Sequence, residues 1–290
     1  MQNKWWAASE LLLATTIWGF GFTASIWALV AFDSISISIL RFGIAFIVGA
    51  IIVRLNREMR PQLNRANLLK SFLPGILLGG MLCLQTWGLE YTTATNSGFI
   101  TTLYVVFVPI IETLVYRKRL ARNHALWVFL ALVGTGLMIK LHFDSFNKGD
   151  ILTLVCAITA SLQMVAVGRV SQTIKSPFAF NTFQSFWAVI ISLIFWPFYG
   201  RVLFQMPDMR AIIGLFSLIF LSTLLGFFLQ VKAQKVLSPS ISSLIFLLES
   251  PFAAIFAIFF LHERLTLWQT AGGVLIFFAA VQATRGESKK

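Results

Sequence analysis

A carboxylate inside a long apolar stretch is the feature that points most clearly to chemistry. Glu249 lies near the middle of segment 239–261, and Tyr104 lies 145 residues earlier in another apolar segment. A charge at the centre of a bilayer costs about 3 kcal/mol or more, so it usually faces a cavity or a partner. We therefore expect Glu249 and Tyr104 to line a polar interior. The alternative is a structural Glu249 that bonds to a neighbouring hydroxyl.

Other polar side chains in apolar segments extend this candidate substrate-binding site. Ser97 and Thr101 share a helical face with Tyr104, and Ser242 shares one with Glu249. An amide in lipid must find hydrogen-bond partners, and these are either another helix or a substrate. The candidate amides are Gln85, Gln163, Gln184 and Gln230.

Two Trp residues lie deeper than the aromatic belt of a membrane protein would place them. Trp18 and Trp187 are central in their segments, so they either pack the core or stack on a substrate. Arg41 also lies within an apolar segment. It either reaches the interface or binds Asp33 or an anionic group, and the structural role is favoured. Glu263 and Arg264 at a segment end are expected to form a loop ion pair.

Two prolines are expected to distort the helices that carry the central residues. Pro251 frees a carbonyl near Leu247, which either coordinates substrate and allows a hinge, or simply marks a fixed kink. Glu249 lies 145 residues after Tyr104, but Pro109 lies three residues beyond the position that is 145 residues before Pro251. The two kinks are therefore not expected to be equivalent.

Several motifs of other chemistries are missing from the sequence. There is no Walker A motif, so we expect no ATP hydrolysis by this chain. There is no Ser/His/Asp pattern and no Cys/His cluster, so we expect no catalytic residues, metal site or cofactor. Any driven process in this chain would then depend on gradients, and Glu249 would be the carrier if protons are coupled.

The composition indicates which solvent these elements face. Of the 290 residues, 58% are hydrophobic and only 12% are charged, about half the usual charged share. The net charge of +12 falls in short loops between apolar runs, which indicates a membrane protein and not a nucleic-acid-binding one. A bilayer-spanning helix needs roughly 20 apolar residues. On this basis the sequence predicts an all-α membrane protein with ten spans: 6–31, 35–54, 71–90, 95–116, 124–141, 149–170, 179–199, 211–231, 239–261 and 266–284.

Basic residues in the connections predict the orientation. With the N-terminus inside, 17 of the 23 basic residues lie on the inner side and five on the outer side. The positive-inside rule then predicts an inner-membrane protein with both termini cytoplasmic.

The chain also repeats weakly against itself. At an offset of 145, Leu84-Gln85 matches Leu229-Gln230 and Ser97 matches Ser242. The offset equals half the length and five spans, so residues 1–142 and 143–290 are predicted to be five-helix repeats of opposite orientation. Inverted repeats are typical of secondary transporters, which alternate access around a site at the midplane.

The segment SLIFLLESPFAAIFAIFFLHERLTLWQTAGGVLIF (243–277) resembles the second repeat of the EamA family in the drug/metabolite transporter superfamily. It has a Pro within a helix, a Leu-x-Glu-Arg-Leu ending and a Gly that opens the next helix. The first copy, TTATNSGFITTLYVVFVPIIETLVYRKRL (92–120), departs from the pattern because Lys118 stands where the second copy has Glu263. The resemblance covers nearly the whole chain. It implies ten helices and export or exchange of small metabolites, and it names no substrate.

The favoured interpretation is thus a secondary transporter that exports small organic metabolites, amino acids or aromatic compounds being candidates. An importer or exchanger on the same scaffold, an intramembrane enzyme acting on lipid-linked substrates and a channel are the alternatives. The expected partners are a small-molecule substrate and the lipid bilayer, but no nucleic acid. Coupling to a proton or a counter-substrate stays open, as does the oligomeric state.

Overall fold

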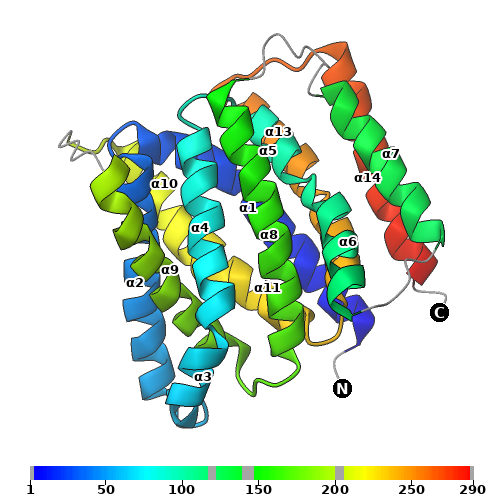
Figure 1. The fold of residues 1–290 in the computed structure, drawn as a ribbon. Coiled ribbons are helices and arrows are strands. Elements are labelled where there is room, and N and C mark those ends of the chain that lie inside the picture. The colour runs from blue at the N-terminus through cyan, green and yellow to red at the C-terminus, as the bar shows by residue number, and fades with distance from the viewer. Residues whose placement is uncertain (1–2, 117–121, 139–146, 200–205, 288–290) are drawn as a thin grey trace.

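A computed structural model describes residues 3–116, 122–138, 147–199 and 206–287, and in these ranges the protein is helical with no strand (Figure 1). The first five sequence segments form α1 (Lys4–Leu29), α2 (Ser34–Leu55), short α3 (Arg65–Lys70), α4 (Phe72–Gly88), α5 (Ala94–Thr101), α6 (Tyr104–Tyr116) and α7 (Arg122–Met138). The remainder forms α8 (Lys148–Ser171), α9 (Pro177–Tyr199), α10 (Met209–Phe216), a π-helical segment (Ser217–Gly226), α11 (Phe227–Ala233), α12 (Pro239–Phe246), α13 (Glu249–Leu261) and α14 (Leu267–Glu287).

Within the described ranges, seven helical segments are long and apolar enough to cross a membrane. They are Lys4–Leu29, Ser34–Leu55, Ala94–Val115, Lys148–Ser171, Pro177–Pro197, Met209–Ala233 and Pro239–Leu261. Phe72–Gly88 and Leu267–Ala279 are shorter apolar helices. Large apolar side chains such as Trp6, Leu114 and Phe259 are at least 70% exposed, as expected of a surface that faces lipid.

Close helix packing depends on glycine at several crossings, including those of α1 with α13 and of α4 with α8. A Cβ on Gly19 of α1 would lie 2.6 Å from the Cβ of Phe252 on α13. Gly88 and Gly149 bring the end of α4 against the start of α8, and a Cβ on Gly149 would lie 2.5 Å from the carbonyl oxygen of Gly88. Small residues of this kind let the helix backbones approach closely within a membrane.

The segments 95–116 and 239–261 were each predicted as one span distorted by a proline. Each is broken in the middle, into α5 and α6 and into α12 and α13. The bounds of the second pair lie 145 residues after those of the first: Ala94 and Pro239, Thr101 and Phe246, Tyr104 and Glu249, Tyr116 and Leu261. The expectation of non-equivalent kinks was therefore wrong, because the breaks coincide in the repeat although the prolines do not.

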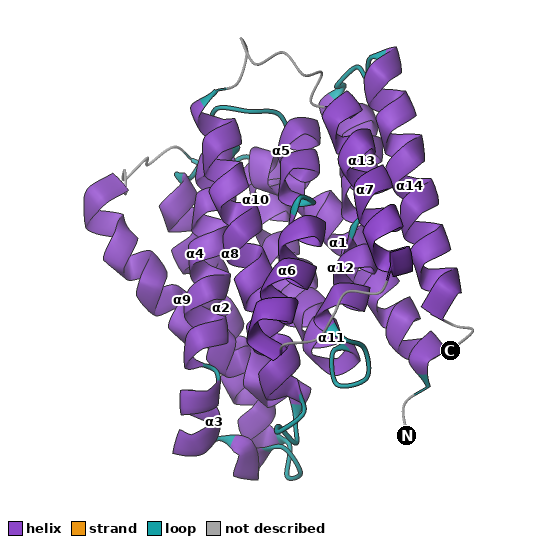
Figure 2. Ribbon diagram, turned by 45° about the vertical axis from the view of Figure 1, so that its right-hand side comes forward, coloured by secondary structure: helices purple, strands orange, loops and turns teal. Residues whose placement is uncertain are grey.

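The two broken helices run in opposite directions and contact each other at both ends. At one end, Glu263 after α13 accepts hydrogen bonds from the backbone N–H groups of Ala94 (3.1 Å) and Thr95 (3.4 Å) at the start of α5. At the other end, Glu112 of α6 accepts from the backbone N–H (3.0 Å) and the hydroxyl of Ser240 at the start of α12. Figure 1 shows α5 beside α13, and Figure 2 shows α6 beside α12.

We call these two contacts the Glu263 cap and the Glu112 cap. Each places a carboxylate on the N-terminal turn of a helix from the other half, where the helix dipole favours a negative charge. The structure shows no ion pair between the described residues Glu263 and Arg264; both oxygens of Glu263 instead accept hydrogen bonds from α5.

Candidate functional site

A small cavity of about 40 Å³ lies at the middle of the bundle, beside the two helix breaks. Helices of both halves supply its walls. The lining residues are Trp18, Gly21, Ser25, Arg41, Met81, Leu82, Gln85, Thr101, Tyr104, Cys156, Ala160, Gln163, Met164, Leu218, Ser222, Phe227, Gln230 and Glu249. This volume admits a few water molecules but is too small for an organic metabolite. Seven of the eleven residues singled out from the sequence line it.

Tyr104 and Glu249 meet directly at this cavity. The Tyr104 hydroxyl contacts Glu249 Oε2 at 3.2 Å and the carbonyl oxygen of Phe246 at 2.7 Å. Both residues are buried, and each is the first residue of the helix that follows a break. The two positions are counterparts in the repeat, so their contact lies where the halves meet.

The break in the second half explains why a carbonyl is available to Tyr104. Ser250 donates its backbone N–H to Leu247 (3.4 Å), and Pro251 has no N–H to donate. The carbonyl of Phe246 is left without its usual helical donor, and Tyr104 supplies a hydroxyl instead. The freed carbonyl thus lies one residue before the expected Leu247.

Buried amides form the polar wall opposite. Gln230 of α11 donates to Gln163 of α8 (3.0 Å), and Gln163 donates to Gln184 of α9 (3.4 Å). The side-chain amide oxygen Oε1 of Gln230 has no hydrogen-bond partner among the described residues, so it can accept a hydrogen bond from a ligand. Gln85 of α4 donates to the hydroxyl of Thr101 (3.2 Å).

Trp18 forms the aromatic wall. Its ring centroid lies 4.8 Å from that of Phe227 and 5.0 Å from that of Phe246. Its indole N–H donates to the backbone carbonyl of Ser222 (3.2 Å), which lies in the π-helical segment. A Cβ on Gly226 would lie 2.5 Å from the indole nitrogen, so a glycine is needed there. Such π-helical turns often occur at functional sites.

The other four residues of the predicted site lie away from the cavity wall. Ser97 pairs with Thr153 (3.4 Å), and the hydroxyl of Ser242 is buried without a described partner. Gln184 accepts a hydrogen bond from Gln163, which lines the cavity. Trp187 donates to the carbonyl of Leu68 (2.8 Å) and packs at 90° on Phe72. For Trp187 this geometry favours the core-packing alternative.

Arg41 is the cavity residue whose importance the sequence understated. It is 3% exposed and lines the cavity, although a structural role was favoured from the sequence. Its Nε donates to Thr223 Oγ1 and its Nη2 to Ser222 Oγ, both at 2.6 Å. Asn181 holds the same turn by donating to the carbonyl of Thr223 (3.0 Å). At an offset of 143 in the sequence, Arg41 aligns with Gln184, one of the central amides, and this alignment was the available signal.

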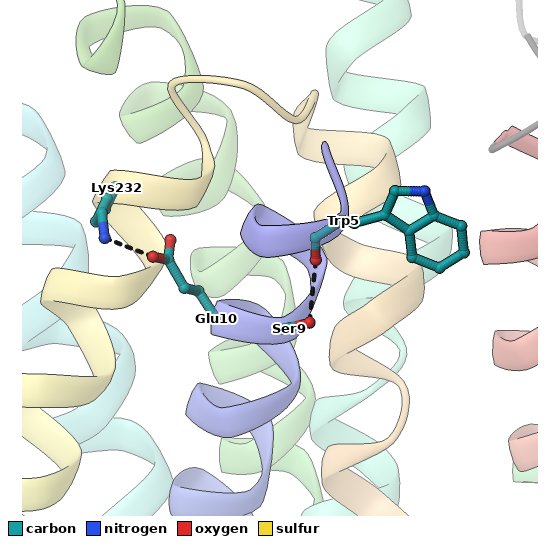
Figure 3. A network of polar contacts seen from close by, with 4 residues as sticks. All are labelled: Trp5, Ser9, Glu10 and Lys232. Atoms are coloured by element: carbon teal, nitrogen blue, oxygen red, sulfur yellow. Dashed lines mark hydrogen bonds and ion pairs between the residues drawn. The ribbon is translucent and has the colours of Figure 1, made fainter. Parts of the chain in front are cut away.

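One ion pair lies at the end of the bundle where α1 begins. Lys232 of α11 pairs with Glu10 of α1, and Ser9 donates to the carbonyl of Trp5 one turn away (Figure 3). The Lys232 side chain is 40% exposed. Lys232 therefore joins α11 to α1.

Comparisons with known proteins agree with this architecture. The model of the EamA-like transporter family matches the chain twice, over residues 5–140 and 147–284. An uncharacterized transporter of Archaeoglobus fulgidus is 32% identical over 279 residues, which are 96% of this chain and 86% of the relative. A solved crystal structure superposes with a TM-score of 0.77 over 98% of both chains at 15% identity, a likeness of fold alone. The chain is a multi-pass membrane transporter and belongs to the EamA-like transporter family.

Proposed function

We propose that the protein exports small organic metabolites, amino acids or aromatic compounds among them, across the inner membrane by alternating access. The observation that carries this proposal is the cavity to which both halves contribute, with the contact of Tyr104 and Glu249 between them. A site where two repeats meet at broken helices is the arrangement on which many secondary transporters rely.

The architecture we propose is ten spans in two five-helix halves, 1–142 and 143–290, inverted in the membrane with both termini cytoplasmic. The coincident helix breaks and the opposite directions of the two broken helices support the inversion. The ends of the bundle support the orientation, since α1 begins and α14 ends at the same end (Figure 1).

Alternating access needs a closure at each end of the bundle, and we propose that the two caps provide them. The Glu263 cap closes the outer end, and the Glu112 cap closes the inner end. Both caps are formed around a cavity too small for a metabolite, which fits a closed state between the two open ones. Release of one cap at a time would expose the cavity to one side.

Substrate binding is assigned to the polar and aromatic cavity wall. Glu249, Tyr104 and Thr101 lie on the broken helices, while Gln85, Gln163 and Gln230 supply amides and Trp18 an aromatic face. Ser97, Ser242, Gln184 and Trp187 support this wall from behind or pack elsewhere. If transport is coupled to protons, Glu249 is the carrier, because it is the one carboxylate among the described lining residues.

Counterflow in proteoliposomes tests the proposal. The purified protein is reconstituted with an excess of unlabelled compound inside, and uptake of the same labelled compound is measured over a panel of amino acids, aromatic acids, amines and neutral metabolites. A carrier accumulates label transiently above equilibrium, whereas a channel does not. Glu249→Ala should abolish the counterflow of any confirmed substrate. The proposal fails if no member of the panel shows counterflow.

A further inference from the structure

Arg41 is a buried cation, and no residue in the described part of the chain neutralises its charge. Within the described part of the chain, its hydrogen bonds go to two hydroxyls, of Ser222 and Thr223, and no carboxylate lies within ion-pair distance. Its guanidinium carbon also lies 5.6 Å from the ring centroid of Phe42. Hydroxyl dipoles and one ring face compensate a buried charge only partly.

The guanidinium also has unused hydrogen-bonding capacity. An arginine carries five N–H donors in a planar fork, and two of them are used here. The Thr223 hydroxyl donates to the carbonyl of Leu218 (2.8 Å), so it accepts from Arg41 and cannot turn away. The guanidinium is thus fixed in orientation by the π-helical segment, with donors left for a ligand.

Arg41 and Glu249 line the same cavity without forming an ion pair with each other. Burying a guanidinium cation in a membrane cavity without an anionic partner is costly. A ligand that supplies the missing anionic partner would offset this free-energy cost. A planar carboxylate fits the fork of a guanidinium through two parallel hydrogen bonds, which a point charge such as ammonium cannot reproduce.

We propose that Arg41 binds the carboxylate of the transported substrate, so that the substrates of this protein are small organic acids or amino acids and not simple amines. The inference rests on the proposed transport function and adds the chemical class of the substrate and the residue that selects it. Ser222 and Thr223 are positioning residues, since they orient the guanidinium and face it from the π-helical segment.

The test compares each carboxylate with its own amide, which keeps the shape and removes the charge. The pairs are phenylalanine with phenylalaninamide, leucine with leucinamide, and 3-phenylpropionate with 3-phenylpropionamide. Phenyl phosphate is added to test whether a different anion is preferred to a carboxylate. Binding is measured by thermal stabilisation and transport by counterflow. In the unmodified protein we expect at least one carboxylate to bind about tenfold or more tightly than its amide.

Arg41→Gln should remove this preference, leaving carboxylate and amide within about twofold of each other. Arg54→Gln is the matched control, because Arg54 is exposed on the same helix and lies away from the cavity. A merely structural Arg41 would lower the stability of the protein without changing the ratio of the two affinities. A carboxylate preference that survives in Arg41→Gln overturns the proposal.

A measurement on the unmodified protein covers the case in which Arg41→Gln does not fold. Phenylglyoxal modifies arginine, and mass spectrometry of the peptide that contains residue 41 reports its reaction. The carboxylate of a pair should protect Arg41 and the amide should not, and equal protection overturns the proposal. A preference for phenyl phosphate, or counterflow of amides as fast as carboxylates, also overturns it while leaving transport intact. Failure of every compound in counterflow removes the transport function itself.

Discussion

The hydrogen bond between Tyr104 and Glu249 joins two counterpart positions of the repeat. Tyr104→Phe removes its donor and leaves both Glu249 Oε2 and the Phe246 carbonyl without the hydroxyl. We expect the substitution to lower the free energy of unfolding by about 1 kcal/mol, the usual net value of a buried hydrogen bond. Denaturation in detergent measures this loss.

A double-mutant cycle with Glu249→Ala assigns the loss to the pair. If the contact is formed as described, the two substitutions together should cost less than the sum of their separate effects. Strict additivity would mean that Tyr104 and Glu249 do not interact in the membrane protein.

Proton coupling is a separate question at the same residue. Glu249→Gln keeps the size and a hydrogen-bond acceptor for Tyr104 but cannot release a proton. The other titratable side chains that line the same cavity are those of Tyr104, Cys156 and Arg41. If a proton gradient drives transport through Glu249, the Gln variant should lose the dependence of uptake on an imposed pH gradient. Full pH-dependent transport by this variant would exclude Glu249 as the carrier.

The central pair could be predicted because an intramembrane carboxylate is costly and the repeat offset named its counterpart. Arg41 could not be placed so well, since its partners Ser222 and Thr223 are ordinary hydroxyls 181 and 182 residues away in sequence. Trp187 and Trp18 looked alike in sequence, yet only Trp18 lines the cavity. Central depth in a segment does not say which way a side chain points.

At the scale of helices, hydropathy predicted the apolar segments but not their interruptions. The break before Glu249 fits the nearby Pro251, whereas the break before Tyr104 has its proline five residues further on. The π-helical turns at Ser217–Gly226 have no signal in hydropathy. They depend on tertiary contacts of that segment with Trp18, Arg41 and Asn181.

The crossing of α1 and α13 gives a prediction about packing. Gly19→Ala would bring a methyl group within 2.6 Å of the Phe252 Cβ and 3.0 Å of the Ala253 backbone nitrogen. Because neither atom lies at the end of a flexible side chain, we expect a loss of about 1–3 kcal/mol in stability. Gly136→Ala in α7 is the control, since nothing lies within 4 Å of its added Cβ. Equal melting temperatures of the two variants would contradict this packing.

Loss of either cap is predicted to increase access to the cavity, but from opposite sides of the membrane. Cys156 lines the cavity and is a native reporter, once Cys83 is replaced by Ser. Glu263→Ala should speed alkylation of Cys156 by a membrane-impermeant maleimide added to right-side-out vesicles. Glu112→Ala should do so in inverted vesicles, because each cap closes a different end.

Glu58→Ala is the control for both caps, as Glu58 is an exposed carboxylate in the connection after α2. It should change alkylation from neither side. If Glu263→Ala and Glu112→Ala accelerate labelling equally from the same side, the caps do not act as separate closures.

At the scale of the whole molecule, inversion of the halves makes equivalent connections lie on opposite sides of the membrane. The connection after α2 is rich in basic residues, and the connection that precedes α10 is its counterpart in the second half. Alkaline phosphatase is active only outside the inner membrane, so a fusion after Asn64 should be inactive and one after Pro207 active. A fluorescent protein that matures only in the cytoplasm should give the reverse pattern. Five predicted spans, an odd number, lie between these two positions. Both fusions on the same side would therefore contradict the inversion and would mean that not all five spans cross the membrane.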